Sequence, residues 1–178
     1  MRNRAWTTIL LALVVVVSSP AAAQSTGRDA TRESLSTLLA SAGQRADVNV
    51  AFRRSTKNPY NFTGTMTGLT NADNLEIVIS VTKSDTIGFR VYPHYSGGYI
   101  NIGKAKDATA LMRELLYLSD QNFLFWGADD TGDVFCGYTV TLESGFPRDA
   151  IVIVLRSIHN TDKFVGQLRP FIDGTSAR

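Results

Sequence analysis

Apolar and polar residues alternate along two stretches in the first half of the chain. Over residues 61–67, threonines occupy one set of alternate positions, and Phe62, Gly64 and Met66 occupy the other. Over residues 75–82, leucine, isoleucine and valine alternate with mostly polar residues. A period of two is typical of β-strands that bury one face. The pattern therefore predicts two half-buried strands.

The same alternation continues further along the chain. It predicts a third strand over residues 87–92, a turn over residues 93–98 and a fourth strand over residues 99–102. A weaker alternation predicts a short strand over residues 48–52, followed by a loop that reaches Tyr60. Because the turns between successive strands are short, we expect the strands to form an antiparallel meander.

Two stretches have apolar residues at every third or fourth position, which is the spacing of an amphipathic helix. They cover residues 31–42 and 108–119. Gly43 follows the first stretch and ends it, because glycine tolerates the positive φ that closes many helices. Asp107 precedes the second stretch, where its carboxylate can accept hydrogen bonds from the first free N–H groups. We therefore expect a helix at each place.

Two further strands are predicted in the second half of the chain. Residues 123–126 are apolar on both faces, which predicts a strand that is central or covered on both sides. Residues 129–133 read as a hairpin in which Gly132 supplies a positive φ, and residues 134–142 alternate again. Cys136 lies within this alternation and is predicted to be buried. It is the only cysteine, so no disulfide can form within the chain.

A helical segment is predicted to open at Pro147 and to break near Asn160. Proline suits the first helical position, where its missing N–H costs nothing. Residues 151–155 are mostly β-branched and also fit a strand, so this alternative stays open from the sequence. The resulting order is α-β-β-β(-β)-α-β-β-α. It predicts an α+β fold in which helices flank an antiparallel sheet.

The N-terminal segment has the pattern of a secretory signal peptide. Two early arginines precede an apolar run, and three alanines end at Ala23. The pattern predicts cleavage between Ala23 and Gln24, with an uncleaved anchor as the alternative. The predicted organisation is a signal peptide (1–23), a flexible leader (24–30), a single domain (31–173) and a tail (174–178). We therefore expect a periplasmic or secreted protein with no membrane span after cleavage.

Removal of the predicted signal peptide changes the charge of the chain. The full chain has 18 basic and 16 acidic residues, and Arg2 and Arg4 lie in the predicted signal peptide. The remaining chain is formally neutral and contains no block of like charges. Nucleic-acid binding requires a basic patch, so the sequence argues against it.

Several turn and core segments of the second half carry a family resemblance. They are the helix end 118–122, the aromatic stretch 123–126, the hairpin 130–134, the strand 139–142, the segment 143–146 and the final helix as far as Leu168. In this order they resemble the YbjN family, which is labelled as bacterial sensory transduction regulators and is similar to the type III secretion chaperone-like fold. The resemblance implies a binding role, often as a dimer, and supplies no catalytic residues.

Few residues have the spacing of a catalytic or metal site. Asp130-Thr131-Gly132 matches the catalytic tripeptide of aspartic proteases, but those enzymes need a second such carboxylate. Neither His94 nor His159 has the spacing of a zinc site. The sequence thus predicts no cofactor and no metal. A hydrolase-like enzyme that uses Asp129, Asp130 or His94 stays as an alternative, and it requires these side chains to converge in one cleft.

Four aromatic residues are the candidate partner-binding residues: Tyr92, Tyr95, Tyr99 and Trp126. Exposed aromatic side chains suit a binding surface, whereas packing at the rim of the core is the alternative. The leading hypothesis is an exported, non-enzymatic binding, chaperone-like or regulatory protein of the bacterial envelope. It would hold a protein partner and is compatible with a homodimer. An envelope structural or stress protein with no ligand is a further alternative.

Overall fold

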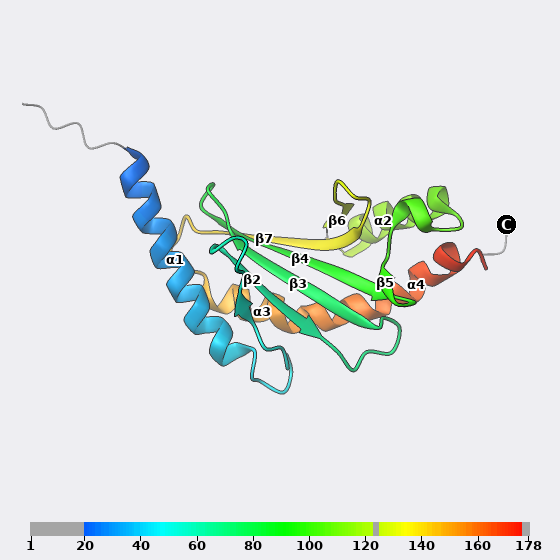
Figure 1. Ribbon diagram of the computed structural model, residues 1–178, viewed down its shortest axis with the longest axis horizontal. Helices are drawn as coiled ribbons and strands as arrows, with labels where there is room; N and C mark the ends of the chain where they lie inside the picture. Colours follow the sequence, from blue (N-terminus) through cyan, green and yellow to red (C-terminus); the bar gives the residue numbers. More distant parts are fainter. Residues whose placement is uncertain (1–19, 123–124, 176–178) are drawn as a thin grey trace, which may run out of the picture.

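The computed structural model describes residues 20–122 and 125–175, with side chains from Gly27 onward (Figure 1). The predicted signal peptide before residue 20 lies outside this part of the chain. The helices are α1 (Pro20–Ala42), α2 (Ala108–Asn122), α3 (Arg148–Ser157) and α4 (Thr161–Asp173), with short 3-10 turns at Ile102–Lys104 and Ile158–Asn160. The strands are β1 (Arg53–Arg54), β2 (Asn61–Met66), β3 (Asn74–Val81), β4 (Thr86–Tyr95), β5 (Gly98–Tyr99), β6 (Phe125–Ala128) and β7 (Val134–Thr141).

The described strands form one antiparallel sheet of seven strands, so the predicted α+β class is confirmed. The strand order is β1-β2-β3-β4-β7-β6, and β5 pairs with the end of β4. In β3 and β4 the buried residues face each other, with Ile77 opposite Val91 and Ile79 opposite Phe89. The alternating apolar residues predicted for these strands therefore lie on the buried face of the sheet.

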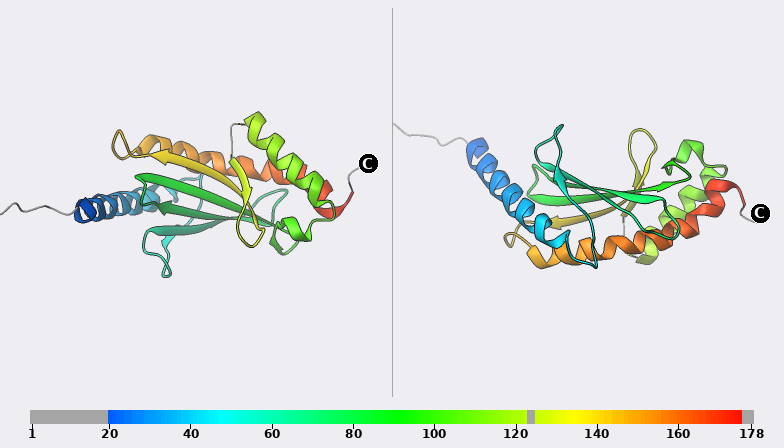
Figure 2. Two further views of the ribbon diagram at one scale, coloured as in Figure 1. Left: turned by 90° about the horizontal axis from the view of Figure 1, so that it is seen from above. Right: turned by 60° about the horizontal axis from the view of Figure 1, so that its bottom comes forward.

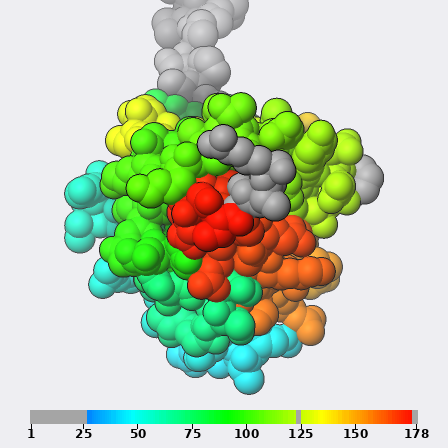
Figure 3. Space-filling view, turned by 90° about the vertical axis from the view of Figure 1, so that its right-hand side faces the viewer, coloured from blue at the N-terminus to red at the C-terminus, as the bar shows by residue number. Residues whose placement is uncertain are grey.

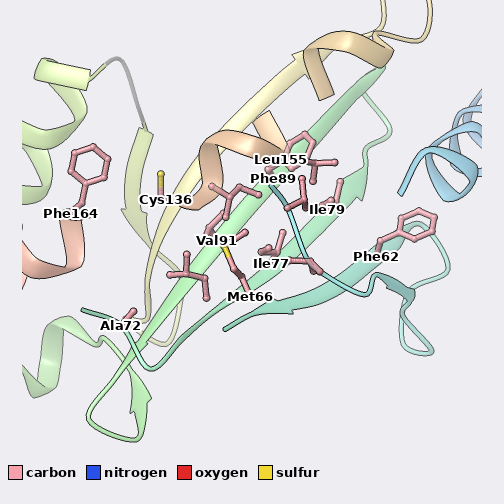
Figure 4. Packing of buried hydrophobic residues seen from close by; sticks show 14 of the residues in the cluster. Phe62, Met66, Ala72, Ile77, Ile79, Phe89, Val91, Cys136, Leu155 and Phe164 are labelled. Atoms are coloured by element: carbon pink, nitrogen blue, oxygen red, sulfur yellow. The ribbon is translucent and has the colours of Figure 1, made fainter. Parts of the chain in front are cut away.

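Helices α3 and α4 run along one face of the sheet (Figure 2). Leu155 of α3 lies over Phe89 and Val91 of β4, and all three side chains are buried (Figure 4). Leu35, Leu38 and Leu39 of α1 join the same buried cluster. Full burial of one such side chain stabilises the fold by about 1.5–3 kcal/mol, so this face of the sheet holds the core.

Helix α1 begins earlier than the sequence predicts. It starts at Pro20 and not at residue 31, so the predicted leader, 24–30, is helical. Arg28 lies within that segment, and its guanidinium donates to the Val81 carbonyl at 2.6 and 3.0 Å. The same guanidinium lies 3.5 Å from the centre of the Tyr60 ring. These contacts tie the segment to the sheet, which the polar composition of the segment does not reveal.

The prediction of a strand over residues 48–52 is wrong. Val48 and Val50 are buried, but they belong to the chain reversal after α1. The Val50 N–H donates to the Gly43 carbonyl at 2.9 Å, and a side chain at Gly43 would collide with the Val50 carbonyl. The edge strand is the two-residue β1, which pairs with β2. The alternation of valines reflected burial in a turn and not a strand.

The turn after β4 is shorter than predicted. The strand continues through Pro93 to Tyr95, and the reversal occupies only Ser96 and Gly97. Both have a positive φ, of 58° and 83°, which is typical of a two-residue β-hairpin. The strand predicted over residues 99–102 shrinks to β5, because a 3-10 turn starts at Ile102.

The strand predicted over residues 123–126 is β6, and residues 123–124 lie outside the described chain. The prediction that it is central is wrong, because β6 is the outer strand beside β7. The Phe125 side chain is 62% exposed, whereas Trp126 is only 4% exposed and meets the Phe164 ring edge-on at 6.1 Å. Trp126 faces the core, and Phe125 faces the opposite side of the sheet. Apolar residues therefore occupy both faces of this strand.

The C-terminal region is helical as predicted. Residues 151–155 lie in α3, the 3-10 turn that ends at Asn160 interrupts the helix, and α4 follows. Pro147 is predicted to be the first helical residue, but α3 begins one residue later, at Arg148. Helix α4 ends at Gly174, whose φ is 72°. Its C-terminal end lies beside α2 at one end of the molecule, where the N–H of Asp107 donates to the Phe171 carbonyl at 3.0 Å (Figure 3).

Candidate functional site

The face of the sheet opposite α3 and α4 is open and hollowed. The hollow has a volume of about 810 Å³, which is in the range of ligand-binding pockets. The residues that line it come mostly from β2, β3, β4, β6 and β7, with Thr82 just after β3 and Val154 from α3. They include the aromatic residues Tyr92, Phe125 and Phe135 and the hydroxyl residues Ser80 and Thr139. We call this surface the open face.

Gly88 lines the hollow and is the third residue of β4. Apart from the adjoining residues of the strand, no atom of the described chain lies within 4 Å of the position that a Cβ atom would take there. Gly137, on the neighbouring strand β7, differs because a Cβ atom would lie 2.9 Å from the Phe125 ring. Glycine weakens a strand interior, and it often marks a place where another molecule approaches the backbone. The fold itself needs Gly137 but not Gly88.

Arg90 is the only charged residue among the described residues that line the hollow. Its guanidinium lies 4.5 Å from the centre of the Phe135 ring and donates to the Tyr92 hydroxyl at 3.4 Å. A cation over an aromatic face is held by attraction to the ring electrons. Arg90 is in none of the ion pairs that the described residues form, although the negative charge of Asp129 lies close enough to interact with it.

Asp129 lies in the β6–β7 hairpin and is occupied by its own turn. Its Oδ1 atom accepts hydrogen bonds from the Thr131 hydroxyl at 2.7 Å and from the N–H groups of Thr131 and Asp133 at 3.0 Å. The hydroxyl of Thr131, the two N–H groups and the nearby Arg90 charge hold the pKa of Asp129 below its ordinary value. The prediction of a turn here is confirmed, and Gly132 has the expected positive φ of 84°.

A second polar cluster lies along the β3–β4–β5 end of the open face. The Tyr99 hydroxyl donates to Glu76 Oε2 at 2.6 Å, and this hydrogen bond and burial raise the pKa of Tyr99 to about 12. The Tyr99 ring lies 4.1 Å from the His94 ring and meets the Tyr92 ring edge-on at 5.9 Å. The Nε2 atom of His94 is 3.7 Å from Glu76 Oε2 and has no hydrogen bond among the described residues.

The structure separates the four predicted partner-binding residues. Tyr92 and Tyr99 lie together on the open face. Tyr95 is on the covered side, where its hydroxyl donates to Asp173 at 2.8 Å and its ring lies under Arg169 at 4.8 Å. Trp126 is buried in the core. Of the four, only Tyr92 and Tyr99 are placed to meet a partner on this face.

The residues of the enzyme alternative are not joined by any contact in the described chain. His94 contacts Glu76 and Tyr99, whereas Asp129 forms its hydrogen bonds within its own hairpin and interacts with the Arg90 charge. Among the described residues, no group of three histidine, cysteine or acidic side chains is spaced to hold a metal ion. Within that part of the chain, the candidate residues are not brought together as a nucleophile, base and orienting group.

Two buried polar groups have structural roles. Cys136 is fully buried, as predicted, and burial raises the pKa of its thiol to about 12. Asp162 of α4 is 7% exposed and accepts hydrogen bonds from the N–H groups of Thr70, Asn71 and Ala72 at 2.8–3.1 Å. Burial raises the pKa of Asp162, but these hydrogen bonds outweigh it and hold the pKa below its ordinary value. Asp162 therefore attaches the loop between β2 and β3 to α4.

A third surface runs along α2. Its exposed side chains recur at helical spacing: Thr109, Met112, Arg113, Leu116, Tyr117, Asp120 and Gln121. Leu116 is 69% exposed, and Met112 and Tyr117 are exposed beside it. Neither Arg113 nor Asp120 forms an ion pair with another described residue. We call this set the α2 stripe. The centre of the stripe is apolar. The positive Arg113 lies on its N-terminal side and the negative Asp120 on its C-terminal side.

The sequence does not locate the residues of the open face. Arg90 lies within the predicted strand 87–92, but nothing in the local pattern links it to Phe135, which is 45 positions away. The one local signal is Gly88, a glycine inside that predicted strand. Within the described chain, no helix has the length and apolarity to cross a membrane. No protein-family model matches this chain, and no curated protein matches it either.

Proposed function

We propose that the protein is an exported, non-enzymatic binding domain of the bacterial envelope that holds a segment of a protein partner on its open face. The observation that carries the proposal is the uncovered hollow of about 810 Å³ with unobstructed backbone at Gly88. Helices α3 and α4 cover the other face of the sheet and leave the exposed residues of this face, such as Phe125, accessible to a partner. The resemblance of residues 118–168 to the YbjN family supports the same reading, as a binding or regulatory role.

The nature of the open face favours a polypeptide over a small molecule. A pocket for a small ligand encloses most of the ligand surface, whereas this hollow is a broad depression on one side of a sheet. Phe125 is 62% exposed in it, and a phenylalanine left in water favours association. A hydrolase-like enzyme is supported by no converging residues, and an envelope structural protein would not need the open hollow.

Export is testable at the chain terminus. Helix α1 spans the predicted cleavage site, but its described contacts with the sheet start at Arg28, beyond Gln24. Cleavage would therefore leave those contacts in place. After expression of the full chain, N-terminal sequencing of periplasmic protein should start at Gln24. A cytoplasmic protein that starts at Met1 would contradict export.

The binding surface is testable by crosslinking in cells. A photoreactive amino acid would replace Thr139, which is exposed on the open face, or Lys163, which is exposed on α4 as a matched control. We expect protein crosslinks from position 139 and none of the same size from position 163. Equal crosslinking from both positions, or none from position 139, would refute binding at the open face.

We also propose that two copies of the chain pair through the α2 stripe. In an antiparallel pair centred between Leu116 and Tyr117, Arg113 of each copy lies opposite Asp120 of the other. A single surface then supplies both members of each ion pair, as a two-fold symmetric contact requires. The apolar centre of the stripe would be buried on pairing.

Sedimentation equilibrium of the periplasmic protein, with reducing agent present, tests the pairing. The wild-type chain should be a dimer, and Leu116→Asp should be a monomer. Arg113→Asp and Asp120→Arg should each weaken the dimer, whereas the double variant should restore it, because the exchanged charges again face each other. A monomeric wild type, or single reversals without effect, would contradict pairing through α2.

A further inference from the structure

The charge at the floor of the open face specifies the ligand more closely than the proposed function does. We infer that the hollow binds an acidic residue of an extended partner segment, with its carboxylate on Arg90 and a neighbouring apolar side chain against Phe125 and Phe135. The inference rests on the proposed function, since it concerns the same surface, and it names the chemistry of the partner.

The position of the Arg90 guanidinium suits the binding of a carboxylate. Its guanidinium is held over Phe135 at 4.5 Å, and one nitrogen reaches the Tyr92 hydroxyl at 3.4 Å. Stacking occupies the flat face of the guanidinium and leaves N–H donors at its edge. Two such donors match the two oxygens of a carboxylate. Arg90 is the only charged residue that lines the hollow in the described chain, so its charge favours an anionic group of the ligand, although the neighbouring Asp129 charge partly offsets it.

The carboxylates of the protein near the hollow are not available to Arg90. Glu76 accepts the Tyr99 hydroxyl at 2.6 Å. Asp129 is fixed by Thr131 and the N–H of Asp133 inside its hairpin. Neither is in an ion pair with Arg90, although the charge of Asp129 interacts with Arg90 at longer range. A ligand carboxylate would lie at the edge of the guanidinium.

Apolar walls stand next to this position. The Phe125 and Phe135 rings lie 5.9 Å apart at an angle of 53°, and Phe125 is mostly exposed. Val78 on β3 adds an aliphatic surface across the hollow. A ligand that pairs with Arg90 would therefore bring an aliphatic or aromatic side chain beside its carboxylate, because burial of the exposed Phe125 ring is favourable, whereas Phe135 is already only 5% exposed.

The floor and the rim suit a peptide backbone. Strands β3, β4 and β7 are paired on both sides within the sheet, so a bound segment cannot join them as a new strand. It would lie across the face, close to the backbone at Gly88, where no side chain intervenes. Ser80 and Thr139 line the hollow and offer hydroxyl groups to the peptide amides, whereas the Thr82 hydroxyl is hydrogen-bonded to Thr86 and Ser84.

A peptide library displayed on phage tests the chemistry. Selection would be carried out on periplasmic wild-type protein and on the variants Arg90→Glu, Gly88→Thr and Arg148→Glu. Arg148 is exposed at the start of α3, on the covered side, and serves as the matched charge-reversal control. The expected result is enrichment of peptides with an acidic residue next to an aliphatic or aromatic one. Arg90→Glu should weaken these peptides on the order of 10- to 100-fold, whereas Arg148→Glu should not.

The outcomes separate the inference from the proposed function. Peptides without an acidic residue that ignore Arg90→Glu but are lost on Gly88→Thr would overturn the inference and keep the open face as the binding surface. Peptides that ignore both variants, or no enriched peptides, would overturn both. Calorimetry with 3-phenylpropionate provides one more arm. If this free acid binds as tightly as the selected peptides, the occupant is a small carboxylic acid and the peptide is excluded.

Discussion

Replacement of Gly88 by threonine should stabilise the protein, although most substitutions inside a sheet destabilise it. A Cβ atom at this position has open space around it, so the substitution creates no clash. Glycine in a strand interior costs roughly 0.5–1 kcal/mol through its backbone freedom in the unfolded chain. The new threonine would also stand beside Ser80 and Thr139, its cross-strand neighbours, and such pairs contribute about 0.2–1 kcal/mol. The expected gain in the free energy of unfolding is therefore about 0.5–2 kcal/mol.

Urea denaturation of periplasmic wild-type and Gly88→Thr protein measures this gain. The midpoint should rise with an unchanged slope, because the fold and the surface exposed on unfolding stay the same. Gly64→Ala is the matched control, since a Cβ atom there would lie 2.8 Å from the Phe52 ring and should destabilise by about 1–3 kcal/mol. A loss of stability in Gly88→Thr would show that the chain itself requires this glycine. The argument that Gly88 serves a ligand would then fail.

Two further predictions concern buried polar groups. Asp162→Asn should lower the free energy of unfolding by about 1–3 kcal/mol, because the carboxylate accepts three backbone N–H groups, and urea denaturation at neutral pH measures the loss. Since its pKa is lowered in the folded state, Asp162 stabilises the protein above the pKa of the unfolded chain, and this contribution disappears as the pH falls through the folded-state pKa. The difference between the variant and the wild type should therefore shrink in acid; a difference that is constant with pH would contradict this. Cys136 should react with a thiol reagent only after unfolding, because burial raises its pKa to about 12. Fast labelling of the native protein would refute that placement.

The sequence was most informative where one face of an element is buried and the other is not. Strands β2 and β3 agree with the predicted alternation within one residue at their starts and ends. Residues 151–155 fitted both a strand and a helix, and the helix prediction is confirmed. Ile151, Leu155 and Ile158 are buried at the spacing of one helical face. Local periodicity records burial, and burial follows the fold in these elements.

The same signal failed where burial and secondary structure are not coupled. Val48 and Val50 are buried in a chain reversal, so their alternation predicted a strand that does not exist. Phe125 and Trp126 predicted a central strand because the sequence cannot distinguish an apolar core from an apolar open face. The arrangement of the sheet decides between these, and it depends on pairs such as β4 with β7 that are distant in the sequence.

The candidate site shows why composition alone could not locate it. Gly64 and Gly88 are both glycines inside strands, and the sequence gives no reason to treat them differently. In the structure Gly64 is required because Val50 and Phe52 fill the space beside it, whereas the space beside Gly88 is empty. The packing of the fold therefore requires glycine at position 64, whereas a larger residue would fit at position 88. Open space above Gly88, near the only charged residue that lines the hollow in the described chain, is typical of a surface that binds another molecule.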